Sequence, residues 1–458
     1  MTSDHQASLE EQIDQWRNYL RRRQAIHAVD VTELEDHLRE QVSALVDAGL
    51  TGDEAFLVAV KRMGDLNALS KDFAREHSDR LWKQLVLVPS ESGGPRAQAK
   101  TDAIVAFGLA AAAAVAIKTP ALFGVHWELD ADIIFYLRNL GLFVLPFLTG
   151  YFVWKRRFVG TSTIRWLVVA FVAAAFFANV YPFDLGGYTQ VLAVLHLPIA
   201  LWLIVGIAYA GSRWGEVAGR MDFVRFSGEL FIYFVLIALG GGVFTAALAL
   251  IFQAIGIDME IFITVWLLPS GAAGAVVVAS WLVEAKQGAV ENMAPVLTRL
   301  FTPLFAILML SFLATLVWTG RPLDIEREML IGFDFLLVVV LGLLLYSISA
   351  RNPQRPPGIF DVVQVVLVVS ALLADAAALW AIAARISEFG FSPNRVAALG
   401  ENVILLVNLA WSAVLYIRFL RGRGSFTSLE KWQTNYIPVY AVWAAIVVVI
   451  FPPMFGYI

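Results

Sequence analysis

Six ionisable or amide side chains lie inside long apolar stretches of this sequence, where they could bind a proton, an ion or a small solute. They are Arg138, His196, Asp334, Asp375, Glu401 and Asn402. A charged side chain in hydrocarbon is costly, so such residues usually face neighbouring protein or a water-filled cavity. We therefore predict that they line a polar cavity that binds a lipid head group, a small solute or an ion.

The same residues also have a purely structural interpretation. Long side chains can extend to the membrane surface, and buried charges can form ion pairs such as one between Arg138 and Asp375. Asp375 is the deepest of the carboxylates, so it is the candidate for a proton relay, with a structural ion pair as the alternative. His196 precedes Pro198 by two residues and is either a packing residue at a kink or a titrating switch.

A second candidate lies between two apolar stretches, in the segment that contains Arg385, Glu388 and Arg395. Arginine side chains there could contact anionic groups or help to close a site. The alternative is a capped helix–turn–helix connector, because Ser392 followed by Pro393 is a typical helix start.

The composition indicates a membrane protein. The 458 residues are 59% apolar and only 16% charged, against about 45–50% and about 25% in soluble domains. The absence of cysteine excludes disulfides, thiolate nucleophiles and cysteine-bound metals. The six histidines show no metal-site spacing, and neither a P-loop nor a dinucleotide-binding glycine motif is present. With a net charge of −4, nucleic-acid binding has no electrostatic support. We expect no cofactor, no metal and no enzymatic activity.

From residue 101 onward the chain is a series of hydrophobic stretches. About 20 mostly apolar residues are needed to span a membrane as a helix. The pattern predicts an all-α polytopic domain over 101–458, with about eleven spans. They lie near 102–123, 132–154, 163–181, 188–211, 227–256, 260–283, 298–319, 328–349, 359–385, 397–420 and 435–455. Gly240–Gly242 in the fifth span would allow a break or close helix packing.

Lysine and arginine are concentrated in alternate loops, which predicts the orientation. The loops predicted to be cytoplasmic hold Lys155, Arg156, Arg157, Arg165, Arg213, Arg220, Arg225, Lys286, Arg299, Arg351, Arg355, Arg418, Arg421, Arg423 and Lys431. The opposite loops hold only Arg321, Arg327, Arg385 and Arg395. No signal peptide is present, so we expect the N-terminus in the cytoplasm and, with an odd number of spans, the C-terminus outside. The six candidate residues then fall in the outer halves of their spans.

Residues 1–88 are predicted to form a small cytoplasmic helical bundle. Apolar residues recur at helical spacing near 9–20, 34–45, 56–63 and 69–82. Thr32 with Glu35 and Thr51 with Glu54 have the spacing of capping boxes at helix starts. Residues 89–100, PSESGGPRAQAK, are rich in Pro, Gly and Ser and predict a linker.

The run TELEDHLREQVSALVDAGLTGDEAFLVAVKRMGDLNALSKDF resembles the bacterial permease-prefix (HAAS-type) helical domain. The resemblance covers roughly residues 5–80 and rests on the pattern HLRE…L…GL…EAF..A..RMGD. It implies a domain that precedes multi-span membrane segments. Its role would be either to assist folding and assembly or to dock a regulatory partner.

A second resemblance lies near the C-terminus, in ARISEFGFSPNRVAALGENVILLVNLAWSAVLYI. This stretch is similar to the signature region of a bacterial multi-span family, domain of unknown function 4153. The matching positions are Arg385, Ile386, Glu388, Gly390 and Arg395, whereas Phe389, Phe391 and Ser392 depart conservatively from the family pattern. The resemblance implies a polytopic inner-membrane protein and supplies no activity.

The sequence favours a transporter-like or permease-like protein of the bacterial cytoplasmic membrane, with a regulatory or assembly domain in residues 1–88. The alternative is a membrane sensor that relays a ligand or envelope state through residues 1–88. We expect the lipid bilayer as a partner and a cytoplasmic protein partner for residues 1–88, and the oligomeric state stays open. Many transporters are built from internal repeats. No repeat is evident between 101–256 and 260–455, which counts against a transporter.

Overall fold

The computed structural model describes residue 13 and residues 28–62, 96–127, 130–157, 160–285, 293–319 and 327–458. Within these ranges the regular structure is helical throughout and contains no strand. This confirms the all-α fold class. The chain divides into two compact units, Met1–Gly93 and Gly94–Ile458.

The N-terminal unit contains α2 (Ala28–Asp47) and α3 (Gly52–Arg62). Its own apolar core consists of Ile13, Leu38, Val42, Leu45, Ala55 and Ala59. Apart from Ile13, the helices predicted near 9–20 and 69–82 lie outside the described residues. The unit therefore has a core that is independent of the membrane-spanning helices.

The two predicted capping boxes have different outcomes. At the start of α3, the backbone N–H and the hydroxyl of Thr51 both donate to Glu54 Oε2, at 3.1 and 2.8 Å. These bonds hold the pKa of Glu54 below its usual range. The prediction at Thr32 is wrong, because α2 already begins at Ala28. Glu35 instead accepts from Arg39 one turn later, at 3.0 and 3.1 Å.

The second unit has ten described helices that are long and apolar enough to cross a membrane. The remaining predicted span, the eighth (328–349), corresponds to α13, whose described apolar segment, Asp334–Ala350, is shorter. The helices are α5 (Arg96–Ala116), α6 (Asp130–Arg156), α7 (Thr161–Val180), α8 (Tyr188–Ala210), α9 (Val217–Ala254), η3 with α10 (Phe262–Leu267 and Leu268–Ala285), α12 (Met293–Thr319), α13 (Arg327–Ala350), α14 (Ile359–Phe389), α15 (Pro393–Leu420), and α16 with α17 (Thr427–Val449 and Phe451–Met454). Short helices η1 (Thr119–Phe123) and η2 (Gly211–Gly215) lie in connections.

Two details differ from the sequence prediction. The helix α5 begins at Arg96, so the last five residues of the predicted linker 89–100 are helical. The helix α9 is continuous over 38 residues, so Gly240–Gly242 do not break it. These glycines do not mediate close packing either, because a Cβ built on any of them meets no atom within 4 Å.

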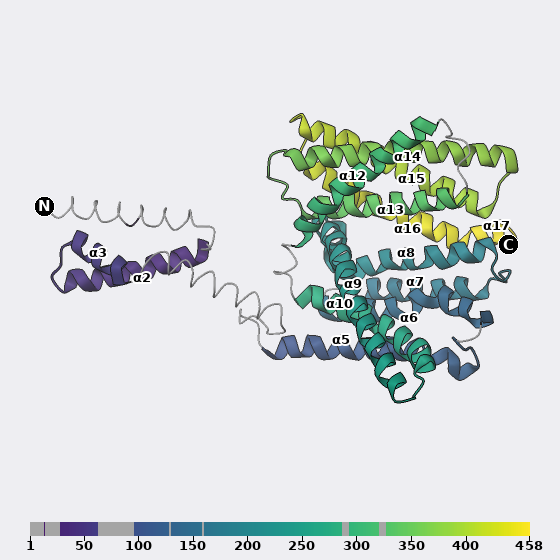
Figure 1. Ribbon diagram of the computed structural model, residues 1–458, viewed down its shortest axis with the longest axis horizontal. Helices are drawn as coiled ribbons and strands as arrows, with labels where there is room; N and C mark the ends of the chain where they lie inside the picture. The colour runs from purple at the N-terminus through teal and green to yellow at the C-terminus, as the bar shows by residue number, and fades with distance from the viewer. Residues whose placement is uncertain are drawn as a thin grey trace. The chain divides into compact units, whose positions relative to one another are not determined.

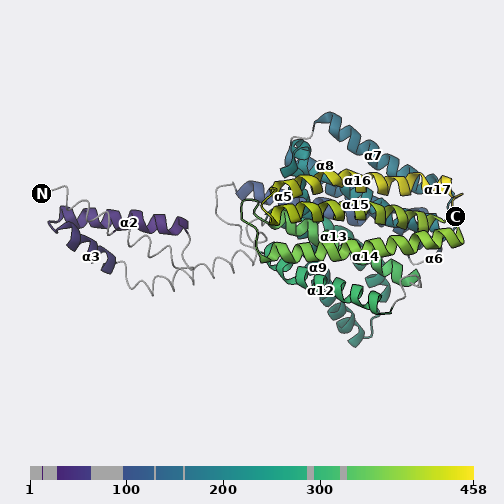
Figure 2. The ribbon, with the colours of Figure 1, turned by 90° about the horizontal axis from the view of Figure 1, so that it is seen from above.

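The described spanning helices form two large apolar cores and two smaller ones. One large core lies among α5–α10, and the other lies mainly among α12–α16. Most helices run roughly parallel to a common axis, with α9 crossing them obliquely (Figure 1). In the second core α14 packs against α15 and α12, while α16 lies between α15 and α8 (Figure 2). This arrangement brings α8, α13, α14 and α15 together around the predicted site residues.

The last residue lies at the same end of the bundle as the start of α8, since the Ile458 carbonyl accepts from the Thr189 N–H at 2.7 Å. This end also holds the turn between α14 and α15. The loop charges predict it to be the outer end, and we call it the predicted outer end; the opposite end is the predicted inner end.

Candidate functional site

Four helices position the candidate side chains. His196 on α8, Asp334 on α13 and Glu401 on α15 each lie about two turns from the predicted outer end of their helix. Asp375 lies about four turns from the end of α14, near the middle of that helix. The structure thus places these carboxylates at two depths, with Asp375 the deeper, as the sequence predicted.

His196 and Glu401 form a direct pair across α8 and α15. The distance from His196 Nε2 to Glu401 Oε1 is 2.6 Å, and His196 Nδ1 lies 2.8 Å from the Leu192 carbonyl. A carbonyl oxygen only accepts, so Nδ1 carries a hydrogen. The Nε2–Oε1 contact therefore requires a second proton, on either the imidazole or the carboxyl group.

Asn402, the next residue on α15, faces a different helix because adjacent residues point about 100° apart. Its side-chain amide donates to Asp334 Oδ1 at 2.9 Å and to the Ala398 carbonyl at 2.8 Å. Asn402 is fully buried, and its side-chain oxygen has no hydrogen-bond partner among the described residues. The consecutive pair Glu401–Asn402 thus connects α8 to α13 through α15.

Asp375 is the least compensated group of the site. It is 0% exposed, and neither carboxylate oxygen has a hydrogen-bond partner within the described ranges. Asp334 is near enough to repel it electrostatically, and Glu401 repels Asp334 in turn. We call Asp334, Asp375, Glu401, Asn402 and His196 the acidic cluster.

The acidic cluster contains three carboxyl groups, and the described part of the chain supplies no lysine or arginine ion pair to any of them. The described residues also contain no group of three His, Cys, Asp or Glu side chains arranged to hold a metal ion. Three carboxyl groups without a paired cation could bind a proton or a cation.

Arg138 is separate from the acidic cluster. Its guanidinium lies 5.5 Å from the centre of the Phe183 ring, in the connection between α7 and α8. Its Nε is buried without a hydrogen-bond partner in the described ranges. The ion pair between Arg138 and Asp375 that the sequence left open does not form, because α6 and α14 are not neighbours. The amide of the next residue, buried Asn139, bonds the amide of exposed Asn179 at 2.8 and 2.9 Å.

The segment with Arg385, Glu388 and Arg395 forms the turn between α14 and α15. Arg395 donates to the carbonyls of Phe389 and Gly390, at 3.1 and 2.8 Å, which closes the end of α14. Ser392 accepts from the Arg395 N–H at the start of α15. Glu388 is exposed. These contacts are those of the capped connector, and they orient α15 so that Glu401 and Asn402 point inward.

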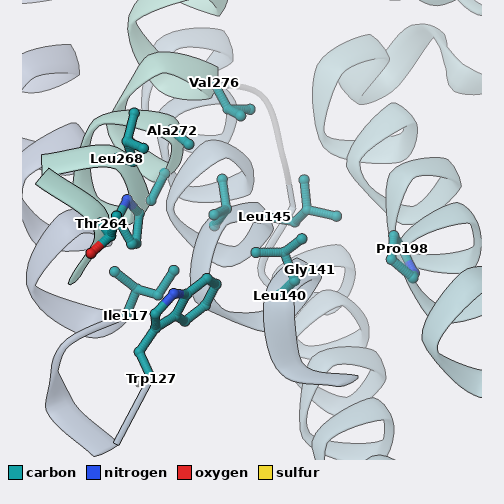
Figure 3. A pocket seen from close by; sticks show the side chains of 13 residues that line it. Ile117, Trp127, Leu140, Gly141, Leu145, Pro198, Thr264, Leu268, Ala272 and Val276 are labelled. Carbon is teal, nitrogen blue, oxygen red and sulfur yellow. The ribbon is translucent and has the colours of Figure 1, made fainter. Parts of the chain in front are cut away.

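A cavity of about 550 Å³ lies apart from the acidic cluster, between α6, α8, α10 and the end of α5 (Figure 3). Its lining is apolar, with Trp127 and Ile117 at one side and Pro198 at the other. His196 precedes Pro198 by two residues and so points away from this cavity, toward α15. The cavity offers no charged group to a solute.

Sequence reasoning missed two sets of contacts near the site, one between Gly400 and Trp443 and one around Gln433. A Cβ on Gly400 would lie 2.0 Å from the Trp443 ring, so only glycine allows α16 to pack this closely beside Glu401. Deeper between α15 and α16, Gln433 bonds Asn408 at 3.0 Å and Ser412 at 2.7 Å. The amides of Asn408 and Gln433 stand out in apolar stretches and were available as a signal, whereas nothing in the sequence pairs Gly400 with Trp443.

Comparison of the chain with protein-family models, with curated proteins and with solved structures found no match. Its function is therefore argued from the sequence and from the geometry above.

Proposed function

We propose that this chain is a transporter-like membrane protein in which the acidic cluster binds a coupling ion or a cationic solute. One observation carries the proposal: Asp375 is completely buried, lacks a partner for both carboxylate oxygens within the described ranges, and lies beside a second carboxyl group. An uncompensated buried carboxylate costs several kcal/mol. A chain that retains it in the middle of a membrane helix is expected to fill or neutralise it during a functional cycle.

The surroundings of Asp375 support binding rather than architecture. A buried structural acid would have a cation beside it, as Asp361 near the start of α14 has Arg351 at 2.8 Å. Asp334 and Glu401 are half-buried, and both lie nearer than Asp375 to the predicted outer end of the bundle. The three carboxyl groups therefore form a series that leads toward that end. Carboxyl groups in such series are typical of ion and proton pathways.

The proposal is tested on the gently purified full-length chain in lipid nanodiscs. Native mass spectrometry identifies bound small molecules, and thermal unfolding is followed with and without Na⁺, K⁺ and organic cations, across pH. The cluster should respond to at least one cation or to pH, and Asp375→Asn should remove the response. Glu260→Gln, an exposed acid at the same end, is the matched control. A chain that is empty and insensitive to cations and pH contradicts the proposal.

We also propose the orientation that the loop charges predict, in a bacterial cytoplasmic membrane. Since the chain has no cysteine, single cysteines report sidedness without background. Glu388→Cys should react with a membrane-impermeant thiol reagent from outside intact spheroplasts, and Arg423→Cys only after the membrane is opened. The reverse pattern would invert the orientation and place the acidic cluster in the cytoplasmic half.

A second candidate function, a membrane sensor, is favoured by the separate compact unit Met1–Gly93 with its own core. The resemblance of residues 5–80 to permease-prefix domains fits a regulatory or partner-docking role for this unit. Cross-linking in cells should then recover one cytoplasmic protein with the full-length chain and lose it when Leu38→Asp disrupts the core of the unit. If the chain transports without its first unit and cross-linking recovers no partner, the sensor proposal is contradicted and only the transporter proposal remains.

A further inference from the structure

We propose that Asp375 and Asp334 form a proton-binding site that is open toward the predicted outer end and closed toward the predicted inner end. This inference rests on the proposed function and names its ion. Its first ground is the missing compensation at Asp375, whose two oxygens contact no donor in the described part of the chain. A proton neutralises a buried carboxylate without any further ligand, whereas a metal ion requires several oxygen ligands.

The ligand count separates a proton from a metal cation. Hard cations such as Ca²⁺ take six or more oxygen ligands, and Mg²⁺ requires near-octahedral coordination. No described group of three acidic or histidine side chains could hold a metal ion. The amide of Asn402 presents its N–H, and not its oxygen, to Asp334. A proton on either carboxyl group needs none of these ligands, and it removes their mutual repulsion.

Exchangeable protons are already required nearby, which gives a route to the predicted outer end. The His196–Glu401 contact at 2.6 Å includes a proton, as argued above. The Glu401 side chain is 31% exposed and lies about two turns from the predicted outer end of α15. Asp334 interacts electrostatically with both Glu401 and Asp375.

The charged groups that face Asp375 are few and can be named for each neighbouring helix. The helix α13 contributes Asp334, α15 contributes Glu401 with His196 of α8 behind it, and the outer half of α12, Leu308–Thr319, contains no ionisable residue. No Lys or Arg of the described chain is paired with these groups.

An apolar layer lies between Asp375 and the predicted inner end. It is a single buried cluster whose members include Leu337, Val340 and Leu344 of α13, Leu367, Val368 and Ala371 of α14, and Leu405 and Leu409 of α15. The next polar group inward on this face of α14 is Gln364, which donates to Thr302 and Ser347 at 3.1 and 2.6 Å. Ser370 lies between them, but its hydroxyl is bonded to the Leu367 carbonyl of its own helix. Between Asp375 and Gln364, this face of α14 therefore offers a proton no chain of polar groups, and the bonded side chains of Asn408, Ser412 and Gln433 lie on the side of α15 that faces α16.

The experiment is infrared difference spectroscopy on the full-length chain in nanodiscs, in H₂O and D₂O, near neutral pH. A protonated carboxylic acid has a carbonyl band that a carboxylate lacks, and the band shifts when O–H becomes O–D. Wild type minus Asp375→Asn should contain one such band, unchanged by Na⁺ or K⁺. Wild type minus Glu260→Gln, the exposed control, should contain none. Circular dichroism of each variant verifies that the helices are intact.

The outcomes separate the inference from the proposed function. If the band is absent and Na⁺ or K⁺ stabilises the wild type but not Asp375→Asn, the site holds a metal cation and the proton inference is overturned, while the proposed function stands. If the band is absent and no cation has an effect, both are overturned. The closed inner side is tested with single cysteines: Ala398→Cys should react from the predicted outer end, and Ala371→Cys should react from neither side. Labelling of Ala371→Cys from the inner side would contradict the closed layer.

Discussion

Buried carboxylates in the two halves of the membrane domain differ in whether a cation lies beside them. At the predicted inner end, the Glu284 side chain is 2% exposed and pairs with Arg156 at 2.8 Å and Lys155 at 3.5 Å. Asp361 there is held by Arg351 at 2.8 and 3.1 Å. In the predicted outer half, Asp375 is just as buried and, among the described residues, has neither a cation nor a hydrogen-bond donor.

This difference separates architecture from function. Glu284 and Asp361 join helices at an end where arginine and lysine are plentiful, and each charge has a fixed partner, so these pairs define the packing. Asp375 has no fixed partner among the described residues, and under the proposed function its protonation state depends on what the site binds. A variant that shows the inner ion pairs to be dispensable, or Asp375 to be structural, would contradict this difference between the two ends.

The largest effect is expected at the inner end, from Arg351→Gln. Arg351 forms two bonds to Asp361, donates to the Arg355 and Pro356 carbonyls, and lies over the Phe419 and Phe426 rings, at 4.7 and 4.4 Å from their centres. Removing one partner of a buried ion pair costs about 3–5 kcal/mol. Unfolding of the purified chain in mixed detergent micelles measures the loss.

The control for this variant is Arg355→Gln, an exposed arginine of the same loop. Its unfolding free energy should stay within about 0.5 kcal/mol of the wild type. Equal losses in both variants would mean that Asp361 does not need its partner, and the contrast between the two ends would disappear.

A smaller loss is expected from Gly400→Ala, which tests how rigidly the outer site is supported. The new methyl group would meet the Trp443 ring at 2.0 Å, so α15 and α16 must separate beside Glu401. Overpacking of this kind costs about 1–3 kcal/mol. Gly342→Ala on α13, where no atom lies within 4 Å of the new group, is the matched control and should not be destabilised. Equal unfolding free energies for the two variants would show that the helices around the acidic cluster pack loosely.

The sequence predicted the spans well and the partners poorly, for a physical reason. Hydropathy is summed over about 20 residues, so one atypical residue hardly changes the predicted position of a span. Which side chains meet depends on which helices are neighbours and how each is rotated. Arg138 and Asp375 both fall in predicted outer halves, yet their helices do not pack together, and Arg138 lies over Phe183 instead.

Within the candidate site, the residue type was the signal in the sequence. Asp375 and Asp334 stand out because a carboxylate in an apolar stretch is rare, and in the structure they are near enough to interact electrostatically. The pairing of His196 with Glu401 spans 205 positions and has no local signal. The N-terminal unit shows the same limit of sequence prediction. Thr51 and Glu54 bond each other as the capping-box spacing predicts, whereas Glu35 accepts a hydrogen bond from Arg39.

A modest effect is expected for the His196–Glu401 pair. In a double-mutant cycle with His196→Gln and Glu401→Gln, the coupling should be about 0.6 kcal/mol, the average for hydrogen bonds between membrane helices, and at most about 1.7 kcal/mol. Unfolding free energies of the wild type, the two single variants and the double variant provide it. A coupling of several kcal/mol would make this pair an architectural bond like Arg351–Asp361 and move it out of the proton route.

The smallest effect is expected from Asp375→Asn, and its size decides the comparison. Asparagine has nearly the shape of a neutral aspartic acid and, like it, carries no charge. If Asp375 holds a proton in the folded chain, the substitution changes the unfolding free energy near neutral pH by no more than about 1 kcal/mol, the size of one neutral hydrogen bond. The same measurement on Asp361→Asn, which takes the charge from Arg351, should give a clearly larger loss. If instead Asp375→Asn were as damaging as Asp361→Asn, the Asp375 carboxylate would be charged and compensated in the folded protein, and the outer carboxyl groups would be as structural as the inner ones.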